Sequence, residues 1–173
     1  MARVNHVSVS ARDLSASTQF YSRLIGATPI ATPNFGFPVQ WLAVGDTQLH
    51  LFQSDDRPTV QHHFGVEVDL DGLVAAYRMA VELHVLDDEV FNGQLVELAG
   101  DVVQLYLRDP SGNLVELDAV GAGALPEDVR RRVRVLEDVH PQRGENVQAR
   151  LYIGADRPPS EHHAGVVGGG GDA

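Results

Sequence analysis

Residues 5–10 read Asn-His-Val-Ser-Val-Ser, and a similar stretch, His-His-Phe-Gly-Val-Glu-Val, recurs at residues 62–68. Apolar residues alternate with polar ones in both stretches, which is the period of a β-strand packed on one face. His6 stands on the polar side of the first stretch and His63 on the polar side of the second. The chain therefore contains an internal repeat that places a histidine on the same kind of strand face twice.

A helical pattern follows each of these strands. Apolar stripes at helical spacing run from Leu14 to Ile25 and from about Leu70 to Leu83. Asp13 and Asp69 stand just before them, and an aspartate is a good N-cap because its carboxylate accepts hydrogen bonds from free backbone N–H groups. Gly26 is suited to end the first helix. Each repeat thus begins as strand and helix.

Three short strands are expected after each helix. In the first repeat they lie between Ala27 and Asp55, and in the second they lie near residues 89–97, 102–108 and 113–119. Residues 109–112, Asp-Pro-Ser-Gly, suit a type I turn that joins the last two strands into a hairpin. The order βαβββ therefore occurs twice.

The last strand of each repeat carries a polar side chain between apolar neighbours: His50 in the first repeat and Glu116 in the second. Because helices cover the apolar faces, these side chains should point with His6 and His63 into the concavity of a curved sheet. Three imidazoles and one carboxylate form a site of intermediate softness, usable by one divalent ion of Fe, Mn, Ni, Co or Zn. The repeat therefore predicts a metal cavity.

Composition narrows the choice of partners and sites. The chain of 173 residues has no cysteine, so a metal must use imidazole, carboxylate or water. Its formal net charge of −11 argues against binding to nucleic acid or to an anionic membrane surface. With no signal-like segment and no apolar run long enough to span a bilayer, we expect a cytoplasmic protein that binds a small molecule.

The predicted class is α+β: two tandem βαβββ modules form a curved mixed sheet around a metal cavity, with a C-terminal helical extension. The expected boundaries are 1–58 for the first module, 59–120 for the second and 121–173 for the extension. Further along, residues 147–153 could form a strand, and the last residues read as a flexible tail. An amphipathic helix is expected early in the extension from apolar residues on one face: Leu125, Val129, Val133 and Leu136.

These features resemble the vicinal oxygen chelate superfamily, which contains glyoxalase I, extradiol dioxygenases, methylmalonyl-CoA epimerase and the fosfomycin and bleomycin resistance proteins. The resemblance covers roughly residues 3–119. Residues 62–67 look like the family's metal-binding strand, and residues 109–116 look like its last hairpin with a glutamate ligand. The resemblance implies one divalent metal ion with these ligands: His6, His63, Glu116 and, at a position that varies in the family, His50.

The resemblance also implies an enzyme whose small substrate chelates the metal through adjacent oxygens. We expect proton transfer next to a carbonyl, as in a glyoxalase-like or epimerase-like lyase or isomerase. Glu116 is the first candidate for the proton-transferring group, and Glu67, on the same strand face as His63, is the second. We also expect a homodimer; the cavity could form within one chain or across two.

Two alternatives remain. An extradiol-type dioxygenase is favoured by Tyr106, which stands where those enzymes carry a tyrosine before the turn. That reading lacks the catalytic histidine which these enzymes carry before the tyrosine, because no histidine lies between His84 and His140. A non-catalytic drug-binding protein, like the bleomycin resistance proteins, would generally lack the ligand set. Phosphonate transfer, as in fosfomycin resistance, ranks behind both because cationic residues near the site are few.

Overall fold

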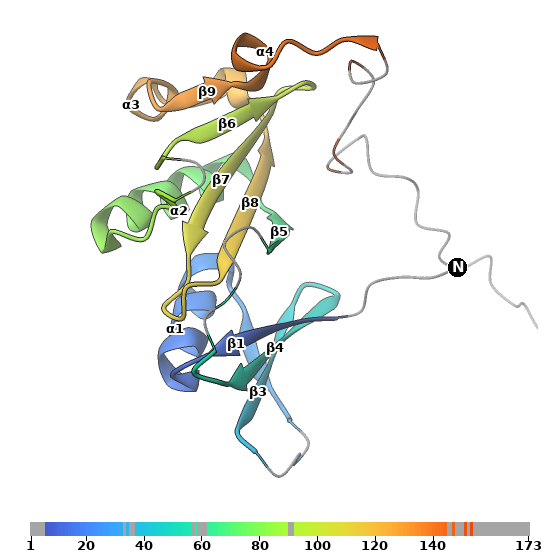
Figure 1. Ribbon diagram of the computed structural model, residues 1–173, viewed down its shortest axis with the longest axis vertical. Helices are drawn as coiled ribbons and strands as arrows, with labels where there is room; N and C mark the ends of the chain where they lie inside the picture. Colours follow the sequence, from blue (N-terminus) through green and yellow to red (C-terminus); the bar gives the residue numbers. More distant parts are fainter. Residues whose placement is uncertain are drawn as a thin grey trace, which may run out of the picture.

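The computed structural model describes residues 6–32, 34, 37–56, 58, 62–89, 92–144, 147, 151 and 153. The predicted order of elements occurs twice (Figure 1). The first module contains β1 (His6–Ala11), α1 (Leu14–Ile25), β2 (Thr28–Ile30), β3 (Val39–Val44) and β4 (Thr47–Gln53). The second contains β5 (His63–Glu67), α2 (Leu70–Leu83), β6 (Leu95–Leu98), β7 (Val102–Arg108) and β8 (Leu114–Val120). The predicted α+β class is confirmed.

The strands form two sheets, ordered β1-β4-β3-β2 and β5-β8-β7-β6-β9. In both sheets the first strand of the module runs parallel to the last, and the other pairs within the module are antiparallel. The registers also match: Ser8, two residues after His6, pairs with His50, and Gly65, two residues after His63, pairs with Glu116. The sequence repeat is therefore a structural repeat at the level of individual residue pairs.

The helices begin and end where their capping residues predict. The Asp13 carboxylate accepts from the N–H of Ala16 at 2.9 Å, and the Asp69 carboxylate accepts from the N–H of Gly72 at 2.6 Å. Gly26 ends α1 in the left-handed region with φ of 66°. These caps satisfy donors that a helix start leaves free, so the boundaries are set locally.

Both helices lie on one side of the molecule, with the strands on the other (Figure 1). One continuous core takes in the inner faces of α1 and α2 and the apolar faces of both sheets. Leu49 and Leu51, on either side of His50, and Val115 and Leu117, on either side of Glu116, belong to that core. The polar faces of the sheets therefore point away from the helices, as the alternation predicts.

The turn between β7 and β8 fastens the second module to the first. The buried Asp109 carboxylate accepts a hydrogen bond from the Tyr21 hydroxyl of α1 at 2.8 Å and from the Asn113 side-chain amide at 2.7 Å. The same amide also donates to the carbonyl of Ser10 in β1 at 2.6 Å. Backbone N–H groups of the turn complete the set around Asp109. One carboxylate thus connects a helix of one module to a hairpin of the other.

β6 is shorter than the sequence pattern predicts. It begins at Leu95, whereas the expected strand covered 89–97. Asn92 and Gly93 adopt positive φ values of 51° and 64°, which form a turn and interrupt any extended segment there. Before this turn, Asp87 pairs with the Arg108 guanidinium at 2.7 Å and holds the connection against β7.

The C-terminal extension differs from a single amphipathic helix. It forms η1 (Ala122–Ala124), α3 (Glu127–Arg130), β9 (Val133–Val135) and α4 (Leu136–Val139). β9 runs parallel to β6 and adds a fifth strand to the second sheet. The Val-Arg-Val sequence suits this strand because β-branched residues favour extended backbone. Most of the expected strand at 147–153, and all of the expected tail from 154 onward, lie outside the described residues.

No helix among the described residues is long and apolar enough to cross a membrane.

Candidate metal centre

The second module brings two of the four candidate ligands together. The His63 Nε2 atom, at the start of β5, lies 2.9 Å from the Glu116 Oε2 atom in β8. Two donors bound to one ion at about 2.1 Å and at right angles are about 3 Å apart. His63 is partly exposed, whereas Glu116 is buried. The 2.9 Å separation is that of a direct hydrogen bond or ion pair; it also equals the spacing of two adjacent positions around a metal ion, and the pair is open on the histidine side.

A polar cluster surrounds Glu116 on the same face. Gln104 in β7 donates from Nε2 to Glu116 Oε1 at 2.5 Å and to Asp118 Oδ1 at 3.0 Å, and it accepts from the Tyr106 hydroxyl at 3.1 Å. Burial and, next in size, the neighbouring Glu116 carboxylate together raise the pKa of Asp118 to about 7. Burial, together with Glu116, also raises the pKa of Tyr106. The cluster therefore holds the Tyr106 hydroxyl protonated beside the carboxylates.

Gly65 makes room for this cluster on β5. A Cβ atom at this position would lie 3.0 Å from Asp118 Oδ2 and 3.7 Å from Glu116 Oε1. Its φ is not in the left-handed region, so space rather than backbone conformation explains the glycine. The absence of a side chain lets the two carboxylates lie over the β5 backbone.

We expect the substitution Gly65→Ala to lower stability by roughly 1–3 kcal/mol, the usual cost of overpacking. The added methyl group should push Asp118 away from Gln104, which breaks their 3.0 Å hydrogen bond. Urea unfolding of the metal-free protein measures the effect. In an Asp118→Ala background the same substitution should cost much less, with a coupling of about 1 kcal/mol or more; purely additive effects would contradict this explanation.

The first module pairs the other two candidate ligands in a different way. The rings of His6 and His50 are stacked with centroids 4.4 Å apart and planes 17° apart. Trp41 stacks on the other face of His50 at 4.2 Å and 5°. The His50 Nε2 atom lies 2.9 Å from Gln48 Oε1, an oxygen that can only accept, so Nε2 carries the hydrogen and Nδ1 the lone pair. Burial lowers the pKa of His50, and His6 lowers it further.

The structure forms two separate pairs from the four candidate ligands. Within the described part of the chain, no group of three or more histidine, aspartate or glutamate side chains is placed to hold a metal ion. The pairs still fit a divalent ion by chemistry, because imidazole and carboxylate are ligands for borderline metals. His63 and Glu116 have the required spacing. His6 and His50 do not, because nitrogen lone pairs lie in the ring planes and near-parallel rings cannot both point at one ion; one ring would have to turn.

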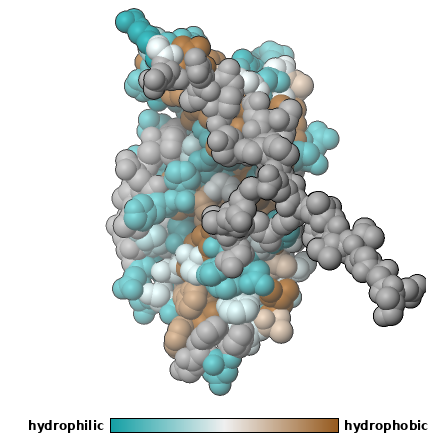
Figure 2. All heavy atoms as spheres, turned by 90° about the vertical axis from the view of Figure 1, so that its right-hand side faces the viewer, coloured by the Kyte–Doolittle hydropathy of each residue, from teal (hydrophilic) through white to brown (hydrophobic). Residues whose placement is uncertain are grey.

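The second candidate for proton transfer, Glu67, lies at the end of β5 opposite Asp118 in the strand register. It is exposed and lines a hollow of about 700 Å³ between β5 and the β3–β4 turn. His63 lines another hollow, of about 340 Å³, against residues 7–10 of β1. Space for a small molecule therefore exists beside both ends of β5. The helices cover the opposite faces, and the side away from them mixes hydrophilic and hydrophobic surface (Figure 2).

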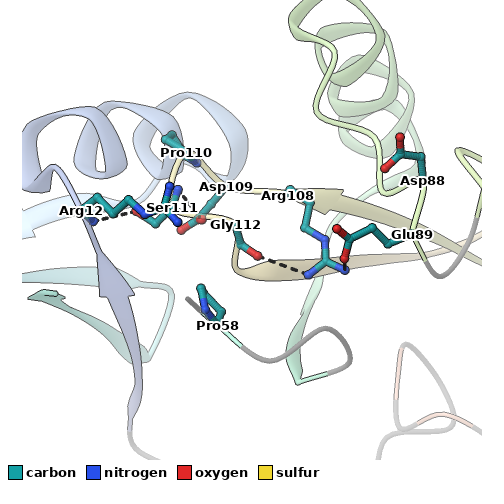
Figure 3. A pocket seen from close by; sticks show the side chains of 9 residues that line it. All are labelled: Arg12, Pro58, Asp88, Glu89, Arg108, Asp109, Pro110, Ser111 and Gly112. Atoms are coloured by element: carbon teal, nitrogen blue, oxygen red, sulfur yellow. Dashed lines mark hydrogen bonds and ion pairs between the residues drawn. The ribbon is translucent and has the colours of Figure 1, made fainter. Parts of the chain in front are cut away.

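A third hollow, of about 420 Å³, lies beside the β7–β8 turn (Figure 3). In it, Arg108 donates to the carbonyl of Gly112 at 3.2 Å and pairs with Asp87. None of the four candidate ligands is among its described lining residues, which are Arg12, Pro58, Asp88, Glu89, Arg108, Asp109, Pro110, Ser111 and Gly112. This hollow is part of the junction between the modules and lies apart from the ligand pairs.

Sequence reasoning missed two polar neighbours of the ligands. Asp118 stands two residues after Glu116, and Gln48 stands two residues before His50, so the strand period already placed each beside its ligand. Gln104 and Tyr106 stand two residues apart on β7, and the structure places both in the cluster around Glu116. These four residues could have been found from the sequence by their position, because each lies on the same face as a candidate ligand, on its strand or on the neighbouring strand.

Comparison with known proteins agrees with this architecture. The sequence model of the Glyoxalase/Bleomycin resistance protein/Dioxygenase superfamily matches residues 3–117. The chain is 27% identical to the mitochondrial methylmalonyl-CoA epimerase of Mus musculus over 133 residues, which cover 68% of this chain and 73% of that protein. It is 25% identical to Glyoxylase I 4 of Arabidopsis thaliana over 169 residues, which cover 88% and 94%.

A solved structure supports the fold independently. The fosfomycin resistance protein of Listeria monocytogenes aligns with a TM-score of 0.55 at 14% identity, over 75% of this chain and 98% of that one. At this identity the likeness concerns the fold alone. Family model, repeat and strand order agree, and the chain belongs to the glyoxalase/bleomycin resistance protein/dioxygenase superfamily.

Proposed function

We propose that this protein is a metal-dependent enzyme that moves a proton on a carbon next to a carbonyl, as a lyase, isomerase or epimerase. Its ligands would be His6, His50, His63 and Glu116. The observation that carries the proposal is the 2.9 Å approach of His63 to Glu116 at register positions that the first module repeats with His6 and His50. The relatives named as an epimerase and a glyoxylase support this class of reaction.

The residues suggest how the reaction would proceed. When bound, a divalent ion would act as a Lewis acid toward two adjacent substrate oxygens. Glu116 takes the hydrogen as a proton from the carbon, and the C–H electron pair moves toward the carbonyl oxygen. Glu116 then returns the proton to a carbon, so nothing is oxidised or reduced. Glu67, at the far end of the same strand face, is the second candidate for one of these transfers.

A second copy of the chain would complete the site. Each module supplies two donors, and the two pairs are separate within the described residues of one chain. In a twofold dimer the first module of one copy meets the second module of the other, and the arrangement occurs twice. The His6–His50 pair of one protomer would then face the His63–Glu116 pair of its partner.

Coexpression of two variants, each of which lacks two of the four candidate ligands, tests the proposed site. One version carries His6→Ala and His50→Ala, and the other carries His63→Ala and Glu116→Gln. Both are coexpressed with different tags free of polyhistidine. The background carries His162→Ala and His163→Ala, which removes two consecutive histidines of the sequence that could bind zinc themselves. Dimers that contain both versions are purified, and their zinc content is measured by mass spectrometry.

Mixed dimers should bind about one ion per two chains, because one of their two sites keeps all four ligands. Each version alone should bind almost none. If the wild type contained zinc but the mixed dimers did not, all four ligands would have to come from one chain. That result would overturn the shared site but not the metal centre. A wild-type protein without stoichiometric metal, together with unchanged small-molecule binding in the His63→Ala variant, would instead support a non-catalytic binding protein.

One observation favours a dioxygenase as the second candidate. Tyr106 pairs with Glu116 in the strand register, and its ring contacts that of His63 edge-on with centroids 6.0 Å apart. A hydroxyl beside the metal ligands could orient a catechol. Oxygen uptake with Fe(II)-loaded protein and catechols, lost in Tyr106→Phe, would support this reaction; proton exchange next to a carbonyl, lost in Glu116→Gln, would support the first.

A further inference from the structure

The polar cluster of the second module contains a residue that acts on the ligands without being one. Gln104 is buried in the middle of β7, diagonally across from Glu116 and directly opposite Asp118 in the register. Its neighbours Val103 and Leu105 point into the apolar core on the helix side. The Gln104 side chain therefore points away from the core, and its hydrogen-bond partners, including Tyr106 on the same strand, lie on the polar face.

The hydrogen bonds of Gln104 fix the direction of its amide. The NH₂ group donates to Glu116 and Asp118, and both of its hydrogens are used there; ionised carboxylates can only accept. The amide oxygen accepts the hydroxyl hydrogen of Tyr106. The opposite orientation would place the amide oxygen against two carboxylates. Tyr106 thus locks Gln104 in the orientation that Glu116 needs.

The two carboxylate oxygens of Glu116 therefore have different partners. Glu116 Oε1 accepts from Gln104 at 2.5 Å, whereas Oε2 lies 2.9 Å from His63 Nε2. Held at one oxygen, the carboxylate cannot rotate freely and presents the other oxygen at the distance for an adjacent ligand position. Gly65 lies beside Glu116 Oε1 and has no side chain, so this residue of β5 cannot hold the carboxylate in place of Gln104.

We propose that Gln104 is a positioning residue that orients Glu116 as a one-oxygen metal ligand, with Tyr106 holding its amide in the required direction. The proposal rests on the proposed function and adds to it a control on metal affinity through a residue that never touches the ion. Partners that orient metal ligands typically contribute 10–100-fold in affinity.

Cobalt(II) is a suitable probe because its visible absorption reports coordination geometry independently of activity. Five tag-free proteins are compared: the wild type, Gln104→Leu, Gln104→Glu, Tyr106→Phe and Val103→Ala. Calorimetry gives the dissociation constant, absorption spectra give the geometry, and urea unfolding of the metal-free proteins gives stability. Val103→Ala is the matched control because it is an adjacent buried residue on the opposite face of β7.

The two Gln104 variants should bind cobalt(II) about 10–100-fold more weakly and change its spectrum. Gln104→Glu should be the weaker binder, since it replaces the donor by a third carboxylate, and Tyr106→Phe should show a smaller loss. Val103→Ala should lower stability yet leave affinity and spectrum unchanged.

Binding by both Gln104 variants within threefold of the wild type, with the same spectrum, would overturn the positioning role alone. Equal weakening in Val103→Ala would do the same, since it would show a general loss of structure. A wild type that does not bind cobalt(II) would overturn the metal centre itself.

Discussion

The substitution His63→Ala is expected to weaken divalent-metal binding by more than about 100-fold, beyond the range for groups that only support a ligand. His63 supplies one of the two donor atoms that already lie at the spacing of adjacent metal positions, 2.9 Å from Glu116. Its loss removes this donor from the side of Glu116 Oε2, whereas the hydrogen bond from Gln104 to Glu116 Oε1 remains. Calorimetric titration of the metal-free protein with zinc measures the effect.

The neighbouring His62 provides the control. It is the same residue type one position earlier, is exposed, and precedes β5. His62→Ala should therefore leave the zinc affinity within about threefold of the wild type, a change well under 1.4 kcal/mol. Equal losses in the two variants would mean that zinc binds a general histidine-rich surface, and the assignment of His63 as a ligand would fail.

The substitution Asp109→Ala should cost about 3–5 kcal/mol of stability, the largest effect on folding that we expect from one residue. The Tyr21 hydroxyl and the Asn113 side-chain amide would both lose a buried acceptor, and each such loss costs about 1–3 kcal/mol. For a chain of this length the melting temperature should fall by roughly 6–20 °C. Urea unfolding and thermal melts of the metal-free protein test this.

A milder variant distinguishes the contribution of the Asp109 carboxylate to stability from that of its single hydrogen bond with Tyr21. Tyr21→Phe removes a single hydrogen bond and leaves Asp109 with its backbone and Asn113 donors, so it should cost about 1 kcal/mol. If Asp109→Ala proved no more destabilising than Tyr21→Phe, the turn would not connect the modules in the way the structure indicates.

The helices and strand faces were predictable because local rules determine them. Asp13 and Asp69 cap the helices through their own side chains, and alternation assigns His6 and His63 to the polar faces without knowledge of the rest of the chain. The strand register then shows that the equivalence of the two modules extends to the pairs Ser8–His50 and Gly65–Glu116.

The remaining features depend on contacts between distant segments. An acidic residue on a strand, such as Asp118, is often solvated, so its position alone did not identify it; the hydrogen bond from Gln104 on the neighbouring strand connects it to the site. Helical spacing of apolar residues in the extension was outweighed by the open edge of β6, which Val133–Val135 joins as β9. The joining of the two ligand pairs remains a prediction, because it depends on the relation between modules or chains.

The stack of Trp41 on His50 gives the protein a built-in optical signal. Trp41 is the chain's single tryptophan, so the ultraviolet emission of the whole molecule comes largely from an indole in face-to-face contact with one candidate ligand. Any event that turns the His50 ring alters the surroundings of that emitter. Occupancy of the first module can thus be followed by fluorescence without a label.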